Sequence, residues 1–182
     1  MAPTLIFGYG NPYRGDDALG PALIQLLERQ QAGGGGGEQR GWPALDADPR
    51  GMPQVCATLP DPKIDGTTPW ELLTDWQLQP EHVLELLGRR RVIWVDADAS
   101  LMMPYRLESI RPERDASYST HGMSPGALLW IHMQIGQGPP PPCFLLRIRG
   151  YHFALDTPLS DGALTNLSLA EAFVLEYLGH NR

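Results

Sequence analysis

The chain has 182 residues, of which 42% are apolar, and it carries a formal net charge of −7 at pH 7. This length and apolar content suffice for one sizeable α/β core and are small for two. The acidic balance argues against a nucleic-acid partner. The sequence contains neither an apolar stretch that approaches a membrane span nor the N-terminal pattern of a signal peptide, so we expect no membrane partner and a cytoplasmic protein.

Residues 4–21 organise the rest of the chain. Residues 4–7 are mostly apolar and are followed by a glycine-containing turn that ends at Asp16 and Asp17. Leucines at helical spacing come next. The order of strand, tight loop and helix is the start of a βαβ unit. Ligands bind at the carboxyl ends of strands in open α/β sheets, and this loop, with Asn11 and the two aspartates, lies at such an end. We expect Asp17 to face the site, and Asp16 and Asn11 to lie nearby but to be turned towards the backbone, where they cap or brace the loop.

Two simpler interpretations of this loop exist. Gly8 and Gly10 could begin a dinucleotide-binding fingerprint, but the third glycine is missing, and Asp16 and Asp17 would repel a pyrophosphate at the helix N-terminus. The two acids could instead only cap the helix and complement its dipole. Two consecutive acids exceed what a cap needs, which favours a further function for the loop.

Apolar runs alternate with helical patterns along the chain, which predicts an α/β fold: a three-layer sandwich with a mostly parallel central sheet flanked by helices. The clearest strand is 91–98, because the continuous apolar run 92–95 is typical of a central parallel strand covered on both faces. This run ends at Asp96. The other predicted elements are strands at 71–78, 105–110 and 143–148, a short helix from Pro80 to Gly88, a helix from Pro125, and a final helix at 166–178.

Residues 30–62 contain five consecutive glycines followed by scattered prolines, aspartates and arginines, without any periodicity. Such a composition cannot bury enough apolar surface to offset the entropy cost of ordering it. We therefore predict a flexible insertion within a single domain that spans residues 1–182, and we expect this insertion to be dispensable for catalysis. A short strand at 55–59 is the alternative.

The two cysteines, Cys56 and Cys143, are far apart in the sequence and lack CxxC spacing. This pattern fits neither a zinc cluster nor a disulfide framework. Cys143 lies in an apolar run, so we predict that it is a core residue.

Asp17, Asp96 and His121 each follow a predicted strand, at the same edge of the sheet. Two carboxylates and an imidazole suit a divalent ion and leave positions open for water or substrate. A metal held there could polarise a carbonyl group or activate water. Without a metal, the same groups could act as general base and general acid, and the residues alone do not decide between these routes. His132, inside a predicted helix, is expected to be an ordinary surface or packed residue.

The loop also carries a family resemblance. The pattern Gly8-x-Gly-Asn11 followed by Gly15-Asp-Asp-x-x-Gly-Pro21 resembles the N-terminal signature of the nickel–iron hydrogenase maturation proteases. These endopeptidases remove a C-terminal extension from the hydrogenase large-subunit precursor after nickel insertion. The resemblance implies that Asp17, Asp96 and His121 are the catalytic residues and bind the nickel carried by the precursor, which need not be present in the resting enzyme.

Two further segments extend the resemblance. Residues 77–82 and 148–160 are similar to the branch that serves cytoplasmic NAD-reducing or bidirectional hydrogenases. The chain also departs from the family, because many members carry Glu at the position of Asp17 and because the insertion at 30–62 is unusual. The Asp-Gly-Gly-Thr specificity loop of some members has only a weak counterpart at 65–68. These departures concern the choice of hydrogenase rather than the reaction.

Two functions of different classes follow from these residues. The first is an aspartic-type endopeptidase, which would act as a monomer on the large-subunit precursor. The second is a non-catalytic chaperone that senses nickel in the precursor through the same three residues. Cleavage of a nickel-loaded precursor by the purified protein separates the two.

Overall fold

A computed structural model describes residues 3–32, 70–114, 122–136 and 138–179. Its centre is a five-stranded sheet with the strand order β2-β1-β3-β5-β4. Strands β2, β1, β3 and β5 run parallel to their neighbours, and β4 pairs with β5 in the antiparallel direction. The strands are β1 Thr4–Tyr9, β2 Trp70–Asp75, β3 Arg91–Asp98, β4 Tyr105–Ser109 and β5 Cys143–Arg149.

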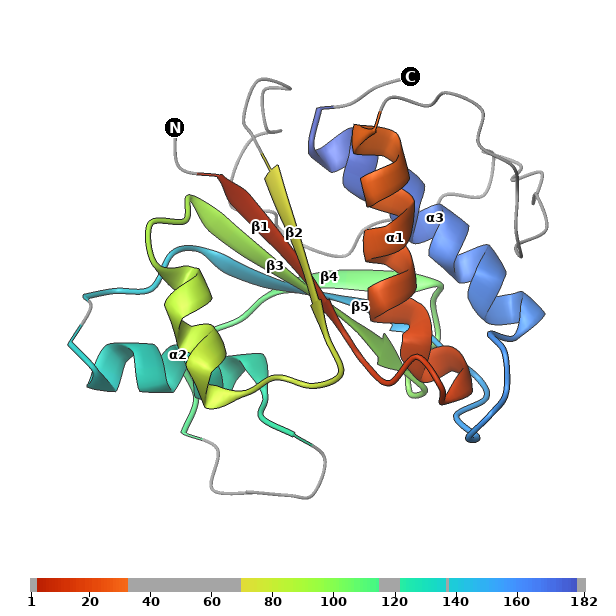
Figure 1. Ribbon diagram of the computed structural model, residues 1–182, viewed down its shortest axis with the longest axis horizontal. Helices are drawn as coiled ribbons and strands as arrows, with labels where there is room; N and C mark the ends of the chain where they lie inside the picture. Colours follow the sequence, from red (N-terminus) through yellow and green to blue (C-terminus); the bar gives the residue numbers. More distant parts are fainter. Residues whose placement is uncertain (1–2, 33–69, 115–121, 137, 180–182) are drawn as a thin grey trace.

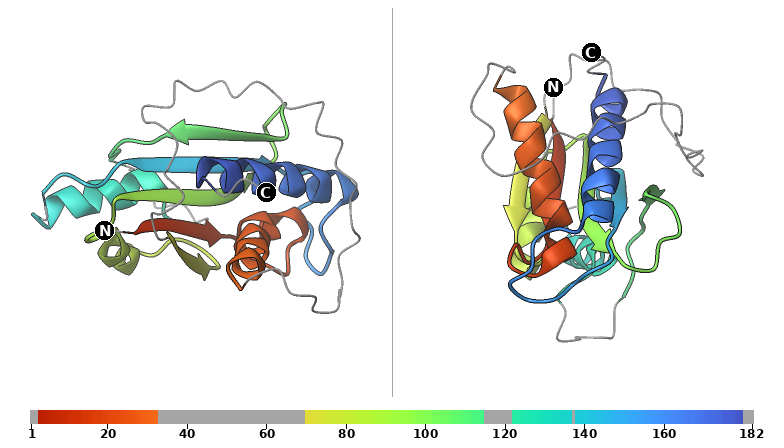
Figure 2. Two further views of the ribbon diagram at one scale, coloured as in Figure 1. Left: turned by 90° about the horizontal axis from the view of Figure 1, so that it is seen from above. Right: turned by 90° about the vertical axis from the view of Figure 1, so that its right-hand side faces the viewer.

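Helices cover both faces of the sheet (Figure 1). One face is covered by α1 and α3, which lie side by side in Figure 2, and the opposite face by α2 and the 3₁₀ helix η3. The predicted three-layer α/β sandwich with a mostly parallel sheet is therefore confirmed. The helical elements are η1 Gly15–Ala18, α1 Leu19–Gln31, η3 Pro80–Leu86, α2 Pro125–Gln134 and α3 Asp161–Tyr177.

The central strands are buried on both faces, because successive side chains of a strand point to opposite sides. Ile93 and Val95 of β3 pack on the face of α1 and α3, whereas Val92 and Trp94 pack on the face of α2 and η3. All four are at most 1% exposed. The sequence prediction of a central strand at 92–95 is confirmed, since β3 pairs with both β1 and β5.

Several boundaries differ from the sequence prediction. Strand β3 has the predicted bounds, Arg91–Asp98, but Asp96 therefore lies within the strand and not on a loop that follows it. Strand β2 ends at Asp75, three residues before the predicted end. Helix α3 begins at Asp161 rather than at 166, because the Ser160 side chain accepts a hydrogen bond from the Ala163 N–H and caps the helix five residues earlier.

The predicted insertion begins at residue 30, but α1 continues to Gln31. The remainder of the insertion, including the alternative strand at 55–59, lies outside the described residues.

Cys143 is buried in the core with a free thiol, as predicted. None of the described helices is long and apolar enough to cross a membrane.

Candidate active site

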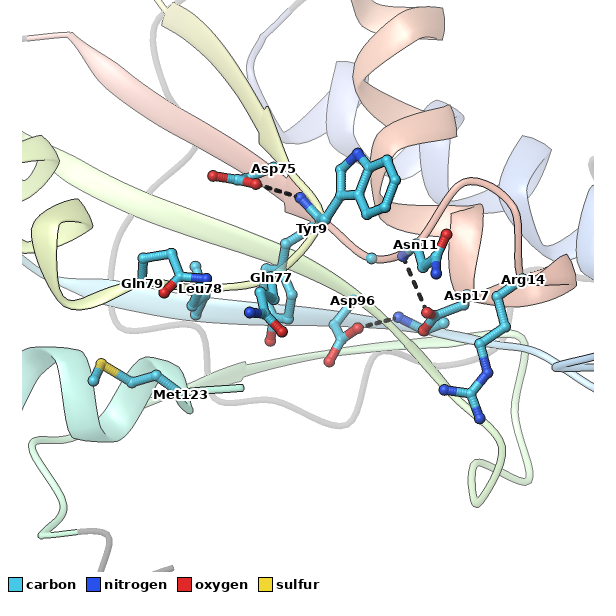
Figure 3. A pocket seen from close by; sticks show the side chains of 13 residues that line it. Tyr9, Asn11, Arg14, Asp17, Asp75, Gln77, Leu78, Gln79, Asp96 and Met123 are labelled. Atoms are coloured by element: carbon cyan, nitrogen blue, oxygen red, sulfur yellow. Dashed lines mark hydrogen bonds between the residues drawn. The ribbon is translucent and has the colours of Figure 1, made fainter. Parts of the chain in front are cut away.

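A polar pocket of about 490 Å³ opens at the carboxyl ends of β1, β2 and β3 (Figure 3). This is the edge at which an open parallel sheet offers a ligand site. Asp17 and Asp96 both line the pocket, so the structure brings together two of the three predicted site residues. The other residues of its lining are Tyr9, Gly10, Asn11, Arg14, Asp75, Trp76, Gln77, Leu78, Gln79, Ala97 and Met123.

Asp17 lies in η1, and one of its oxygens, Oδ2, accepts a hydrogen bond of 3.0 Å from the Asn11 backbone N–H. The turn that permits this contact depends on Gly10, which has φ +142° and whose added Cβ would collide with the Asp17 carbonyl. Asn11 in turn accepts a hydrogen bond from the Tyr13 N–H, so its side chain stabilises the loop. One carboxylate oxygen of Asp17 is thus committed to the loop.

Asp96 is a partly buried carboxylate in the pocket. Its Oδ1 accepts a hydrogen bond of 2.8 Å from the Ala97 N–H, and its side chain is also hydrogen-bonded by Tyr9. Burial raises the pKa of Asp96 to about 7, because desolvation and the nearby charges of Asp17 and Asp98 outweigh the two hydrogen bonds, which lower it. Asp17 is therefore close enough to Asp96 for its charge to raise the pKa of the Asp96 carboxyl group.

Tyr9 is a site residue that the sequence analysis missed. It ends β1 and contacts Asp96 across the parallel pair β1–β3. Burial and the neighbouring carboxylate of Asp96 raise the pKa of the Tyr9 phenol well above its ordinary value, so the phenol stays protonated and donates the hydrogen bond. The available signal was its position at the end of a buried strand, but the facing residue cannot be identified before the strand order is known.

Asp16, the other acid of the loop, faces the segment after β5. Its carboxylate accepts hydrogen bonds from the backbone N–H groups of Tyr151, His152 and Ser160 and from the Ser160 hydroxyl, at 2.6–2.9 Å. Burial acts to raise the pKa of Asp16, but these hydrogen bonds to the ionised form outweigh it and lower the pKa. Asp16 therefore fixes the loop that presents Asp17.

Asp98 and His132, two residues that the sequence offered as alternatives, are not part of the pocket lining. Asp98 forms an ion pair of 2.8 Å with Arg147 and accepts hydrogen bonds from Ser100. His132 lies in α2 and is only 2% exposed, which agrees with the expectation of a packed histidine.

A second cluster, also missed from the sequence, holds the segment on the other side of the pocket. The Nε2 of His82 lies 3.1 Å from Asp75, and the Nδ1 of His82 accepts a hydrogen bond of 2.9 Å from the Gln79 N–H. Asp75 also accepts the Trp76 N–H. These contacts fix residues 76–79, which line the pocket opposite Asp17.

His121, the third predicted ligand, lies outside the described residues. Within the part of the chain that the structure describes, no three His, Cys, Asp or Glu residues are grouped as metal ligands. The pocket thus offers the carboxylates of Asp17 and Asp96 to a cation, whereas both oxygens of the third lining carboxylate, Asp75, already have partners in His82 and the Trp76 N–H. The convergence of His121 with Asp17 and Asp96 stays a prediction.

The two carboxylates permit two kinds of chemistry. Carboxylate oxygens bind divalent cations. Two carboxylates in an open pocket can therefore contact a cation that is itself bound to a larger molecule. A carboxylate can also accept a proton from an attacking water molecule when it lies within hydrogen-bonding distance. Contact of both carboxylates with one cation requires that Asp17 and Asp96 line the same pocket, as observed (Figure 3).

The fold is shared with solved structures of hydrogenase maturation proteases. The [NiFe] hydrogenase maturation protease HycI from Thermococcus kodakarensis KOD1 is 17% identical, with a TM-score of 0.60 over 98% of this chain and 93% of that chain. The hydrogenase maturating endopeptidase HybD from E. coli is also 17% identical, with a TM-score of 0.61 over 97% of this chain and 92% of that chain. No family model and no curated protein sequence matches the chain.

Proposed function

We propose that this protein is an endopeptidase that removes the C-terminal extension of a nickel–iron hydrogenase large-subunit precursor after nickel insertion. The observation that carries the proposal is the pairing of Asp17 and Asp96 in one pocket at the carboxyl edge of the sheet. The fold, shared with proteases of this class, and the motif of residues 8–21 support it.

In this proposal, nickel belongs to the substrate. Asp17 and Asp96, together with His121, contact the nickel of the precursor and so place the nearby peptide bond at the pocket. A carboxylate takes a proton from the attacking water, the oxygen of that water bonds to the peptide carbon, and the C–N bond breaks as the leaving amine gains a proton. Cleavage depends on nickel because only the loaded precursor offers the carboxylates a cation.

The finer features of the proposal rest on sequence motifs. Residues 77–82 and 148–160 resemble the branch serving cytoplasmic NAD-reducing or bidirectional hydrogenases, so we infer a substrate of that kind and a cytoplasmic location. We also infer that the protein acts as a monomer.

The test is to incubate the purified protein with nickel-loaded and with nickel-free large-subunit precursor from the same organism and to determine the precursor's mass. We expect loss of the C-terminal extension from the loaded precursor alone. Binding of the loaded precursor without any cleavage would instead favour the chaperone function. Equal cleavage of both precursors would contradict recognition of nickel.

A further inference from the structure

Two large aromatic side chains are exposed beside the carboxylate pocket. Tyr13 is 60% exposed and Trp76 is 59% exposed, and their rings pack edge to face with centroids 5.7 Å apart. Trp76 lines the pocket itself. The two residues come from different loops, one after β1 and one after β2, so this contact joins the two loops beside the pocket.

The backbone on both sides of this aromatic pair is fixed. The Tyr13 N–H donates to Asn11, and the Tyr13 carbonyl accepts from the Asp156 N–H at 2.8 Å. The Trp76 N–H donates to Asp75, whose other oxygen is paired with His82. An exposed aromatic pair held in this way offers contact area at a low entropy cost, which is the property of binding hot spots.

Arg14 is a third side chain of interest at this pocket. Its Nε donates a hydrogen bond of 3.0 Å to the Phe153 carbonyl, which holds the guanidinium on the Asp17 side of the pocket (Figure 3). Among the residues that the structure describes, no carboxylate forms an ion pair with Arg14. Its terminal N–H groups are therefore available, in a pocket whose other charged lining residues are Asp17, Asp75 and Asp96.

We propose that Tyr13, Arg14 and Trp76 form the docking rim for the substrate polypeptide, which presents an apolar side chain to the aromatic pair and a carboxylate to Arg14. This inference rests on the proposed function and names the substrate chemistry of the same pocket. The assignment of the carboxylate follows from charge, because Arg14 is the cationic lining residue of a pocket whose other charged lining residues are three aspartates. The apolar side chain follows from the exposed rings, whose burial stabilises the complex.

The test measures KM and kcat for processing of the nickel-loaded precursor by Tyr13→Ala, Trp76→Ala and Arg14→Gln. Each variant is expected to raise KM by about tenfold while kcat stays within about twofold, because a rim residue contributes to binding before the reaction. Arg14→Lys should restore part of the affinity, and Arg14→Glu should weaken it further. Leu84→Ala, an equally exposed apolar residue on η3, and Arg29→Gln, on the last turn of α1, are the matched controls and should leave KM unchanged.

Unchanged KM in all three rim variants would overturn the proposal. The same variants are also compared in direct binding of a fluorescently labelled nickel-loaded precursor, which does not require cleavage. Weaker binding by the rim variants with no cleavage by the wild type would support the rim and contradict the endopeptidase. If the wild type cleaves the precursor and the rim variants bind it as tightly as the wild type does, the endopeptidase is supported and the docking rim is contradicted.

Discussion

The carboxylate of Asp16 accepts hydrogen bonds from both the backbone N–H and the hydroxyl of Ser160, a residue 144 positions later in the chain. Ser160 also caps α3. A single buried carboxylate thus joins the loop that carries Asp17 to the start of the last helix. This contact explains why the sequence has two consecutive acids: the first organises the loop and the second faces the pocket.

We expect Asp16→Ala to lower the free energy of unfolding by about 3 kcal/mol, because it leaves several buried donors without a partner. The measurement is urea denaturation followed by circular dichroism. Asp17→Asn is the matched control and should cost less than about 1 kcal/mol, since Asp17 accepts one backbone hydrogen bond at the pocket. Equal stability of Asp16→Ala and the wild type would show that the Asp16 contacts do not stabilise the fold.

Tyr9→Phe is expected to reduce the rate of precursor processing by about tenfold with little change in stability. The substitution removes only the hydroxyl that orients Asp96, and the ring remains packed at the end of β1. The rate is measured with the nickel-loaded precursor, and Tyr105→Phe, on β4 and outside the pocket lining, serves as the control for loss of a phenol. Wild-type rates for Tyr9→Phe would mean that the carboxylate of Asp96 is positioned without this hydrogen bond.

Cys143 is expected to resist alkylation in the native protein. Burial raises the pKa of its thiol to about 12, from an ordinary value of 9.0, so the reactive thiolate is scarce at pH 8. Because the folded pKa is the higher one, the unfolded chain loses this proton first, and the group's contribution to stability falls as the pH rises above 9. Iodoacetamide labelling with peptide mass mapping should show an unmodified Cys143 in buffer and a modified one in urea. Rapid native labelling would contradict this environment.

Much of the fold could be predicted from the sequence, because apolar periodicity reports local structure directly. The central strand at 92–95 and the helix after Ser124 and Pro125 were predicted in this way, and the Ser124 side chain does cap α2. The boundaries were less accurate where a side chain decides them, as at Ser160, since a cap is recognised only together with the turn before it.

The pairing of Asp17 with Asp96 could be predicted because parallel strands place their carboxyl ends at one edge. The contacts of Tyr9 with Asp96 and of Asp16 with Ser160 could not be predicted, since both depend on which elements become neighbours in space. The rim residues Tyr13 and Trp76 were also missed. Nothing local in the sequence distinguishes an exposed aromatic residue from a buried one.

The most direct test of the central claim is one processing assay with nickel-loaded precursor and four variants. We expect Asp17→Asn, Asp96→Asn and His121→Ala each to lose about a hundredfold or more in rate. Asp98→Asn, two residues from Asp96 but paired with Arg147, is the matched control and should lose much less. Circular dichroism confirms that each variant is folded. Full processing of the precursor by Asp96→Asn or by His121→Ala would contradict the assignment of these residues to the active site.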